Sequence, residues 1–153
     1  MTLTTTTHLN FRGDARAALE HYASVFGGQP MITTYADAGM PADVPGADGV
    51  LFGLLASPEG FRVMAYDVPG AGDGGPAGGA GSTRRENGTT VTDQPFFVSV
   101  TAASLDEAQG FFDRLADGAV VVEPLAASAW SPGFGMLTDR LGVTWAFSVD
   151  AGR

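Results

Sequence analysis

The sequence predicts an α+β fold built from two tandem βαβββ modules. One hairpin pattern occurs twice, at residues 52–65 and 134–147, with the same offset of 82 throughout (134 − 52 = 82). A helical pattern precedes each hairpin, and a strand pattern precedes each helix. The chain of 153 residues is long enough for one domain with a full hydrophobic core. We therefore expect a single domain over residues 1–153 in which one structural unit is repeated.

The composition narrows the functional classes. Hydrophobic residues make up 44% of the chain and charged residues 16%, as in a globular protein. The net charge is −9, with 8 Lys and Arg against 17 Asp and Glu, and the arginines are scattered, so no nucleic-acid partner is expected. No apolar run approaches the roughly 20 residues that cross a bilayer, and the sequence has no signal-peptide pattern and no cysteine. We expect a cytoplasmic protein with no membrane partner.

Residues 1–67 form the predicted first module. The periodicity predicts one helix and four strands, the helix at 15–26 and the strands at 4–11, 31–35, 50–56 and 61–67. Asp14 is the predicted N-cap of the helix, and Gly27 and Gly28 are predicted to end it. Residues 36–49 contain Gly, Pro and Asp and are predicted to form a loop.

Residues 68–94 are dominated by glycine. From Pro69 to Thr90 no apolar side chain is larger than Ala or Pro, so this stretch has little surface to bury. We expect a mobile Gly-rich linker between the two modules, or alternatively a lid over a binding site.

Residues 95–153 form the predicted second module. Ser104 and Glu107 have the spacing of a capping box, which predicts the start of a helix at 105–115. The predicted buried face of this helix is Leu105, Ala108, Phe111, Phe112 and Leu115. Strands are predicted at 96–100, at 120–122 as a buried strand, and in the second copy of the hairpin, which ends near Asp150.

Two stretches resemble a known superfamily. Residues 10–22, followed by Val25-Phe26-Gly27-Gly28, resemble the first helix of the vicinal oxygen chelate superfamily, which includes glyoxalases, bleomycin-resistance proteins and extradiol dioxygenases. The second half is similar to the PhnB-like subgroup at Pro124-Leu125, Trp130, Phe134-Gly135, Asp139-Arg140 and Gly142-Val143-Thr144-Trp145. The resemblance covers nearly the whole chain outside the linker. It implies a curved, partly open mixed sheet around a cavity, with the helices outside, and a homodimer.

The resemblance also implies where a metal would bind. Members of the superfamily usually hold a divalent ion through His, Gln or Glu on the facing strands. The matching positions here are Ala146 on the last strand, Met64 in the first copy, Phe96 at the second module's first strand, and Thr6 or His8 on the very first strand. At most one of the four keeps a ligand, and a metal site needs three or more. We therefore expect no metal and no cofactor.

The strand alternation predicts a set of cavity-facing residues. Thr144, Ala146 and Ser148 share one face of the last strand, whereas Trp145 and Phe147 face the helices. The full candidate set for ligand binding is His8, Asn10, Arg62, Met64, Tyr66, Phe96, Trp130, Thr144, Ala146 and Ser148. A mostly apolar lining with a few polar groups is typical of small-molecule sites, although such side chains can also simply fill a closed core.

These observations favour a metal-independent protein that binds an aromatic or amphipathic small molecule. The alternative is a metal-dependent lyase or dioxygenase-like enzyme, which would combine His8 with carboxylates from elsewhere, such as Glu59, Asp67 or Glu123. The sequence contains no cysteine nucleophile, no Gly-x-Ser-x-Gly motif and no phosphate loop between a strand and a helix. The sequence therefore assigns no catalytic residue, and it does not identify the ligand.

Overall fold

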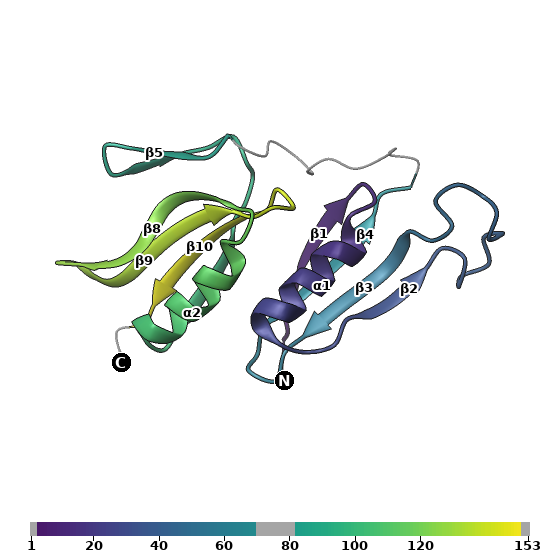
Figure 1. Ribbon diagram of the computed structural model, residues 1–153, viewed down its shortest axis with the longest axis horizontal. Helices are drawn as coiled ribbons and strands as arrows, with labels where there is room; N and C mark the ends of the chain where they lie inside the picture. Colours follow the sequence, from purple (N-terminus) through teal and green to yellow (C-terminus); the bar gives the residue numbers. More distant parts are fainter. Residues whose placement is uncertain (1–2, 70–81, 151–153) are drawn as a thin grey trace. The chain divides into compact units, whose positions relative to one another are not determined.

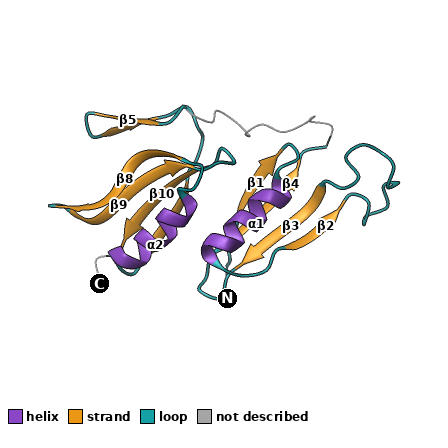
Figure 2. Ribbon diagram, in the orientation of Figure 1, coloured by secondary structure: helices purple, strands orange, loops and turns teal. Residues whose placement is uncertain are grey.

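The computed structural model describes residues 3–69 and 82–150. The chain divides into two compact units, Met1–Gly75 and Pro76–Arg153, each with its own sheet and helix (Figure 1). Each unit contains a four-stranded sheet with one α-helix packed against it (Figure 2). The predicted α+β class with tandem βαβββ modules is confirmed.

The first unit follows the order β-α-β-β-β. Its elements are β1 (Thr7–Phe11), α1 (Ala15–Phe26), β2 (Met31–Thr34), β3 (Val50–Ala56) and β4 (Arg62–Asp67). The strand order in the sheet is β1-β4-β3-β2, where β1 is parallel to β4 and the other neighbours are antiparallel. The helix matches the predicted range, and the first strand is three residues shorter than predicted at its start (7 − 4 = 3).

The core of the first unit lies between α1 and the sheet. Alternate residues of β1 and β4 are buried toward the helix, where they meet its buried face of Ala18, Leu19 and Tyr22. Gly53 of β3 permits this close approach, because a Cβ at this position would lie 2.5 Å from the Leu19 Cδ1 atom. Packing against α1 therefore fixes which face of the sheet points away from the helix.

The side chain that caps the start of α1 differs from the prediction. Asp14 precedes the helix, but its side chain makes no capping hydrogen bond. Instead the buried carboxylate of Asp67 on β4 accepts hydrogen bonds from the backbone N–H groups of Gly13 at 2.8 Å and Ala15 at 3.1 Å. Its second oxygen accepts the N–H of Val50 at 2.9 Å. One side chain thus satisfies donors of the helix, of the connection before it and of strand β3, which local sequence rules for N-caps do not consider.

The second unit begins with a small hairpin, β5 (Arg84–Glu86) and β6 (Thr89–Val91). Its βαβββ module consists of β7 (Val98–Ala102), α2 (Leu105–Leu115), β8 (Val120–Ser128), β9 (Ser131–Thr138) and β10 (Thr144–Val149). The strand order is β7-β10-β9-β8, with β7 parallel to β10. It has the same topology as the sheet of the first unit.

The core of the second unit lies between α2 and this sheet. Phe112 of the helix contacts Phe147 of β10 edge-on, with ring centroids 5.4 Å apart, and Trp145 is fully buried beside it. The Trp145 indole N–H donates to the Asp139 carboxylate at 2.8 Å. At the start of the helix, Ser104 Oγ accepts the Glu107 N–H at 3.1 Å, as the capping-box spacing predicts.

The repeated hairpin has the same register in both units. Leu54 pairs with Met64 in the first unit, and Met136 pairs with Ala146 in the second. Each residue of the second pair is 82 positions after its counterpart in the first pair (136 − 54 = 82 and 146 − 64 = 82). The neighbouring pairs follow the same rule. The sequence repeat therefore corresponds to a repeated pair of strands.

Three further expectations need correction. Residues 84–91, inside the predicted linker, form the β5–β6 hairpin, while residues 70–81 of that prediction lie outside the described residues. The predicted buried strand at 120–122 extends to Ser128, and its residues Val120 and Val121 are 66% and 45% exposed because β8 is an edge strand. The strand predicted at 96–100 lies at Val98–Ala102.

In the described part of the chain no helix is both long and apolar enough to cross a membrane.

Candidate functional site

The face of the first sheet opposite α1, called here the far face, collects five of the predicted site residues. His8 and Asn10 of β1 and Arg62, Met64 and Tyr66 of β4 alternate with residues that are buried toward the helix. The strand registers place His8 beside Met64 and Asn10 beside Tyr66. The sequence prediction that these five side chains share one face agrees with these registers.

The far face continues across the other two strands of the sheet. One row of paired residues crosses all four strands, namely His8, Met64, Leu54 and Met31. Phe52 lies in the next row, paired with Thr33. Met31 is 64% exposed and Phe52 is 42% exposed, so large apolar surface is available on this face. Sequence reasoning missed these residues, although alternation along 50–56 could have included Phe52 and Leu54.

Polar groups lie beside this apolar surface. A hydrogen bond of 3.1 Å joins His8 Nδ1 to Asn10 Oδ1, which requires Nδ1 to carry the proton because an amide oxygen only accepts. The His8 ring contacts Tyr66 edge-on, with centroids 5.2 Å apart. The exposed Arg62 donates from Nε to Thr6 Oγ1 at 3.1 Å. With Nδ1 engaged, His8 Nε2 is the ring nitrogen that can accept a hydrogen bond from a ligand.

Tyr35 and Asp67 adjoin the end of the far face. The Tyr35 hydroxyl donates to the backbone carbonyl of Asp67 at 2.8 Å. Burial raises the pKa of Tyr35, and the nearby Tyr66 and Asp67 raise it further. The Tyr35 hydroxyl is therefore a neutral donor at ordinary pH. Its hydrogen bond connects Tyr35 to the last residue of β4, which follows Tyr66.

The equivalent face of the second sheet has a different character. Thr144, Ala146 and Ser148 lie opposite the buried Trp145 and Phe147, as predicted from alternation. The Thr144 hydroxyl is buried and is hydrogen-bonded to Thr138 Oγ1 at 2.8 Å and to Gln94 Nε2 at 2.9 Å. The Ser148 hydroxyl pairs with that of Thr101 at 3.0 Å. These polar groups are partnered within the unit.

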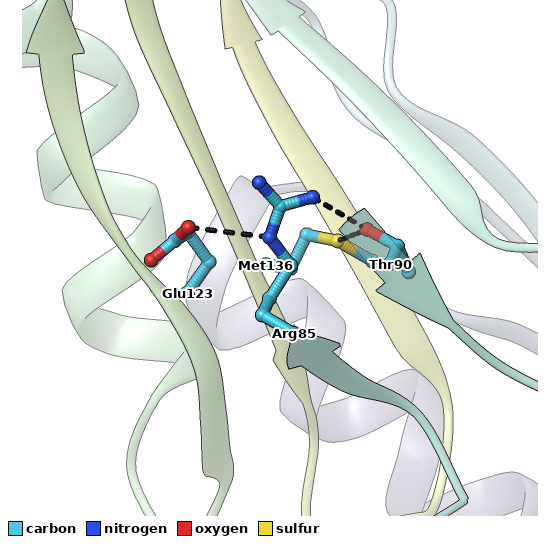
Figure 3. Close-up of polar contacts among 4 residues, drawn as sticks. All are labelled: Arg85, Thr90, Glu123 and Met136. Carbon is cyan, nitrogen blue, oxygen red and sulfur yellow. Dashed lines mark hydrogen bonds and ion pairs between the residues drawn. The ribbon is translucent and has the colours of Figure 1, made fainter. Parts of the chain in front are cut away.

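The β5–β6 hairpin lies against this face of the second sheet (Figure 3). Arg85 Nε lies 3.2 Å from Glu123 Oε1 on β8, and Arg85 Nη1 donates to Thr90 Oγ1 at 2.7 Å. The Thr90 hydroxyl in turn donates to the Met136 sulfur at 3.5 Å. These contacts are polar, so the lack of large apolar side chains from Pro69 to Thr90 does not reveal them.

Two predicted site residues belong to neither set. Phe96 is exposed and precedes β7, and Trp130 is 89% exposed in the turn between β8 and β9. The strand registers also identify the residue that corresponds to His8 in the second unit. His8 lies beside Met64, and the repeat places Ala146 at the position of Met64. Ser99 lies beside Ala146 and is therefore the counterpart of His8. Phe96 is therefore not the position equivalent to His8.

The residues required by the metal-dependent alternative are engaged elsewhere or dispersed. Both Asp67 oxygens accept backbone N–H groups, Glu123 is paired with Arg85, and Glu59 lies in the exposed turn between β3 and β4. Within residues 3–69 and 82–150, no three His, Asp or Glu side chains are grouped as metal ligands would be.

Several solved structures are similar to this chain over nearly its full length. That of protein PA1353 from Pseudomonas aeruginosa has a TM-score of 0.74 and 28% identity, covering 97% of this chain and 98% of that one. A Bacillus cereus structure described as a putative 3-demethylubiquinone-9 3-methyltransferase, PhnB protein, has a TM-score of 0.65 and 24% identity, covering 97% and 100%. A glyoxylase/bleomycin resistance protein/dioxygenase domain from Frankia sp. EAN1pec has a TM-score of 0.61 and 13% identity, covering 97% and 98%.

No protein-family model and no curated protein matches the sequence. The structural similarity nevertheless establishes the fold, because the matched structures share it from end to end. The chain has the glyoxalase/bleomycin-resistance fold, also called the vicinal oxygen chelate fold. This fold supports several unrelated chemistries, so the function must be argued from the side chains on the two sheets.

Proposed function

We propose that this glyoxalase-fold protein binds an aromatic or amphipathic small molecule on the far face of its first sheet, without a metal ion. The observation that supports this most strongly is the row of His8, Met64, Leu54 and Met31, in which the half-buried Met64 lies beside His8 and apolar side chains continue across the sheet to the exposed Met31. Concentrated apolar surface with a few convergent polar groups is typical of ligand sites.

The energetics favour a ligand with a flat apolar body. Covering apolar surface contributes about 25 cal/mol per Å², and Met31 and Phe52 offer such surface on neighbouring strands. His8, Asn10 and Tyr66 add hydrogen-bonding groups at the β1–β4 side of the face. Arg62, exposed on the same strand as Met64, can pair with an acidic group of the ligand.

The side chains at the metal positions support binding without a metal. The registers align His8, Met64, Ser99 and Ala146 as the corresponding positions of the two units. Only His8 is a common ligand of a divalent ion, and one ligand does not hold a metal at ordinary concentrations. A metal-dependent reaction would need two or more further donors, and Asp67 is already engaged by three backbone amides.

We do not extend the methyltransferase name of the Bacillus cereus neighbour to this protein. That name would require a cofactor-binding α/β sheet of parallel strands. Within the described residues both four-stranded sheets are mostly antiparallel, with the β1–β4 and β7–β10 pairs as the parallel exceptions. The sheet topology therefore supports ligand binding more directly than methyl transfer.

Binding of anilinonaphthalene sulfonate, which combines an aromatic body with an anionic group, tests the proposal by fluorescence titration. Phe52→Ser and Tyr66→Ser should each weaken binding by about tenfold, which corresponds to about 1.4 kcal/mol. Trp130→Ser is the matched control, because it removes an exposed aromatic side chain that is not part of the first sheet. Equal effects of all three variants, with circular dichroism unchanged, would contradict a site on the far face.

We further propose that the protein is a homodimer, as the resemblance to the superfamily implies. Strands β1 and β2 are the edges of the first sheet, and β7 and β8 are the edges of the second. The exposed valines of β8, Val120 and Val121, lie on such an edge and favour an intermolecular contact. Light scattering at micromolar concentration should give twice the mass of one chain, and the mass of a monomer would contradict the proposal.

A further inference from the structure

Strand β8 is irregular on both sides of Glu123. Val121 pairs with Leu137, and the next regular pair would join residue 122 to Met136, but Glu123 occupies that position. A second shift follows, since Ala126 pairs with Phe134 where a regular ladder would place residue 125. Such bulges often redirect a side chain next to a functional site. Here they place a carboxylate opposite Met136, where regular pairing would place Val122.

Glu123 lies beside an aromatic ring and an occupied cation position. The Arg85 guanidinium carbon lies 5.3 Å from the centroid of the Phe134 ring, and Arg85 Nε lies 3.2 Å from the Glu123 carboxylate. Figure 3 shows the carboxylate and the guanidinium facing each other, with Thr90 and Met136 on the other side of the arginine. A carboxylate and an aromatic face directed at one cation are the two groups that recognise organic cations.

The element that places Arg85 in this position is short and polar. Each strand of the β5–β6 hairpin has three residues, and they are joined at Asn87 and Gly88, both with positive φ. An isolated two-stranded hairpin is at best marginally stable, so its contacts with the sheet determine its position. The ion pair is partly open to solvent, with side-chain exposures of 22% for Arg85 and 37% for Glu123. An ion pair that is partly open to solvent adds little net stability, so another cation can replace Arg85.

We propose that Glu123 and Phe134 form a binding site for a small organic cation with a guanidinium or alkylammonium group. Arg85 is the internal competitor for this site, and the hairpin regulates access to it. The proposal uses only groups of the second unit and does not depend on the far face of the first sheet. The acidic balance of the chain, with a net charge of −9, also favours a cationic ligand.

The test uses agmatine, which carries both cationic groups, and measures its dissociation constant by calorimetry. Arg85→Ala should bind agmatine about tenfold more tightly than the unmodified protein, because the site is no longer occupied internally. Arg84→Ala is the matched control, since Arg84 lies on the same strand and pairs with Glu86 instead. In the Arg85→Ala background, Glu123→Gln should remove the gain. Equal affinity of Arg85→Ala and the unmodified protein would overturn the proposal, as would a gain that survives Glu123→Gln.

A second measurement covers the case in which Arg85→Ala disturbs the hairpin. In the unmodified protein, the ¹⁵Nε signal of Arg85 should shift toward that of a free arginine as agmatine is added, while the Arg84 signal stays in place. Agmatine binding without movement of the Arg85 signal would place the cation elsewhere and overturn the proposal. The same is true if neither signal changes at millimolar agmatine.

Discussion

The carboxylate of Asp67, at the end of β4, accepts the backbone N–H of Ala15, the first residue of α1, at 3.1 Å. The same oxygen accepts the Gly13 N–H, and the other oxygen accepts the Val50 N–H. Because the hydrogen bonds from Ala15 and Val50 are buried, water cannot easily replace the Asp67 carboxylate as their acceptor. The start of the first helix is thus fixed by a side chain more than fifty residues away in sequence, which also aligns the two central strands beneath it.

Removing this carboxylate should destabilise the protein strongly. Asp67→Ala leaves backbone donors without their acceptor, and we expect the free energy of unfolding to fall by about 2–4 kcal/mol. Asp14→Ala is the control, because Asp14 makes no capping hydrogen bond and should change stability by less than about 0.5 kcal/mol. Urea unfolding followed by circular dichroism measures both. A larger loss for Asp14→Ala would restore the local N-cap interpretation.

The two tryptophans should contribute very differently to stability. Trp145 is fully buried and donates to Asp139 at 2.8 Å, so Trp145→Phe removes a charge-assisted hydrogen bond and should cost about 1.5–3 kcal/mol. Trp130 is 89% exposed, and Trp130→Phe should change the free energy of unfolding by less than about 0.5 kcal/mol. Chemical denaturation curves of the two variants give the comparison. Equal losses would mean that Trp130 is packed in solution.

Stability should decline at alkaline pH through Tyr35. Burial, Tyr66 and Asp67 raise its pKa above 10.0, so the folded protein holds the phenolic proton more strongly than the unfolded chain does. The contribution of the protonated Tyr35 to the free energy of unfolding is fully present below pH 10.0 and is lost as the pH rises through the pKa of Tyr35 in the folded protein. The free energy of unfolding of Tyr35→Phe should therefore depend less on pH in this range. Identical pH profiles for the variant and the unmodified protein would rule out this role.

The sequence predicts most of the fold because its signals are local or repeated. The offset of 82 between the two hairpins appears unchanged in the strand registers of Leu54 with Met64 and Met136 with Ala146. The predicted range of α1 agrees with the structure because apolar residues recur at helical spacing along the whole segment. Asp14 occupies the predicted N-cap position, but its side chain does not cap the helix, and Asp67 supplies an acceptor from a distant strand instead. No local rule contains that information.

The β5–β6 hairpin is not predicted by the sequence, for a related reason. The hairpin contacts the second sheet through polar groups, with Arg85 bound to Glu123 and Thr90 to Met136. Just after the hairpin, Gln94 donates to Thr144. Hydrophobic periodicity detects burial of apolar side chains, and this segment buries almost none. The bulges beside Glu123 are likewise invisible in the alternation pattern.

The grouping of the candidate residues on the strands could be predicted in part. Alternation correctly grouped the five residues of the first unit on one face, and the three residues of β10 on one face of the second sheet. It could not reveal that Thr144 is buried under Gln94, because that depends on the hairpin. Phe96 and Trp130 were included from the resemblance and from sequence order, and the strands do not bring them to either group.

The most direct test of ligand binding on the far face is a chemical-shift map of the ¹⁵N-labelled protein titrated with anilinonaphthalene sulfonate, before and after treatment with a chelator. We expect the largest shifts at amides of β1, β3 and β4 near His8, Phe52 and Met64, and the same map after chelation. Shifts confined to the second unit would contradict a site on the far face. Loss of the shifts after chelation, with recovery on adding a divalent metal, would contradict binding without a metal.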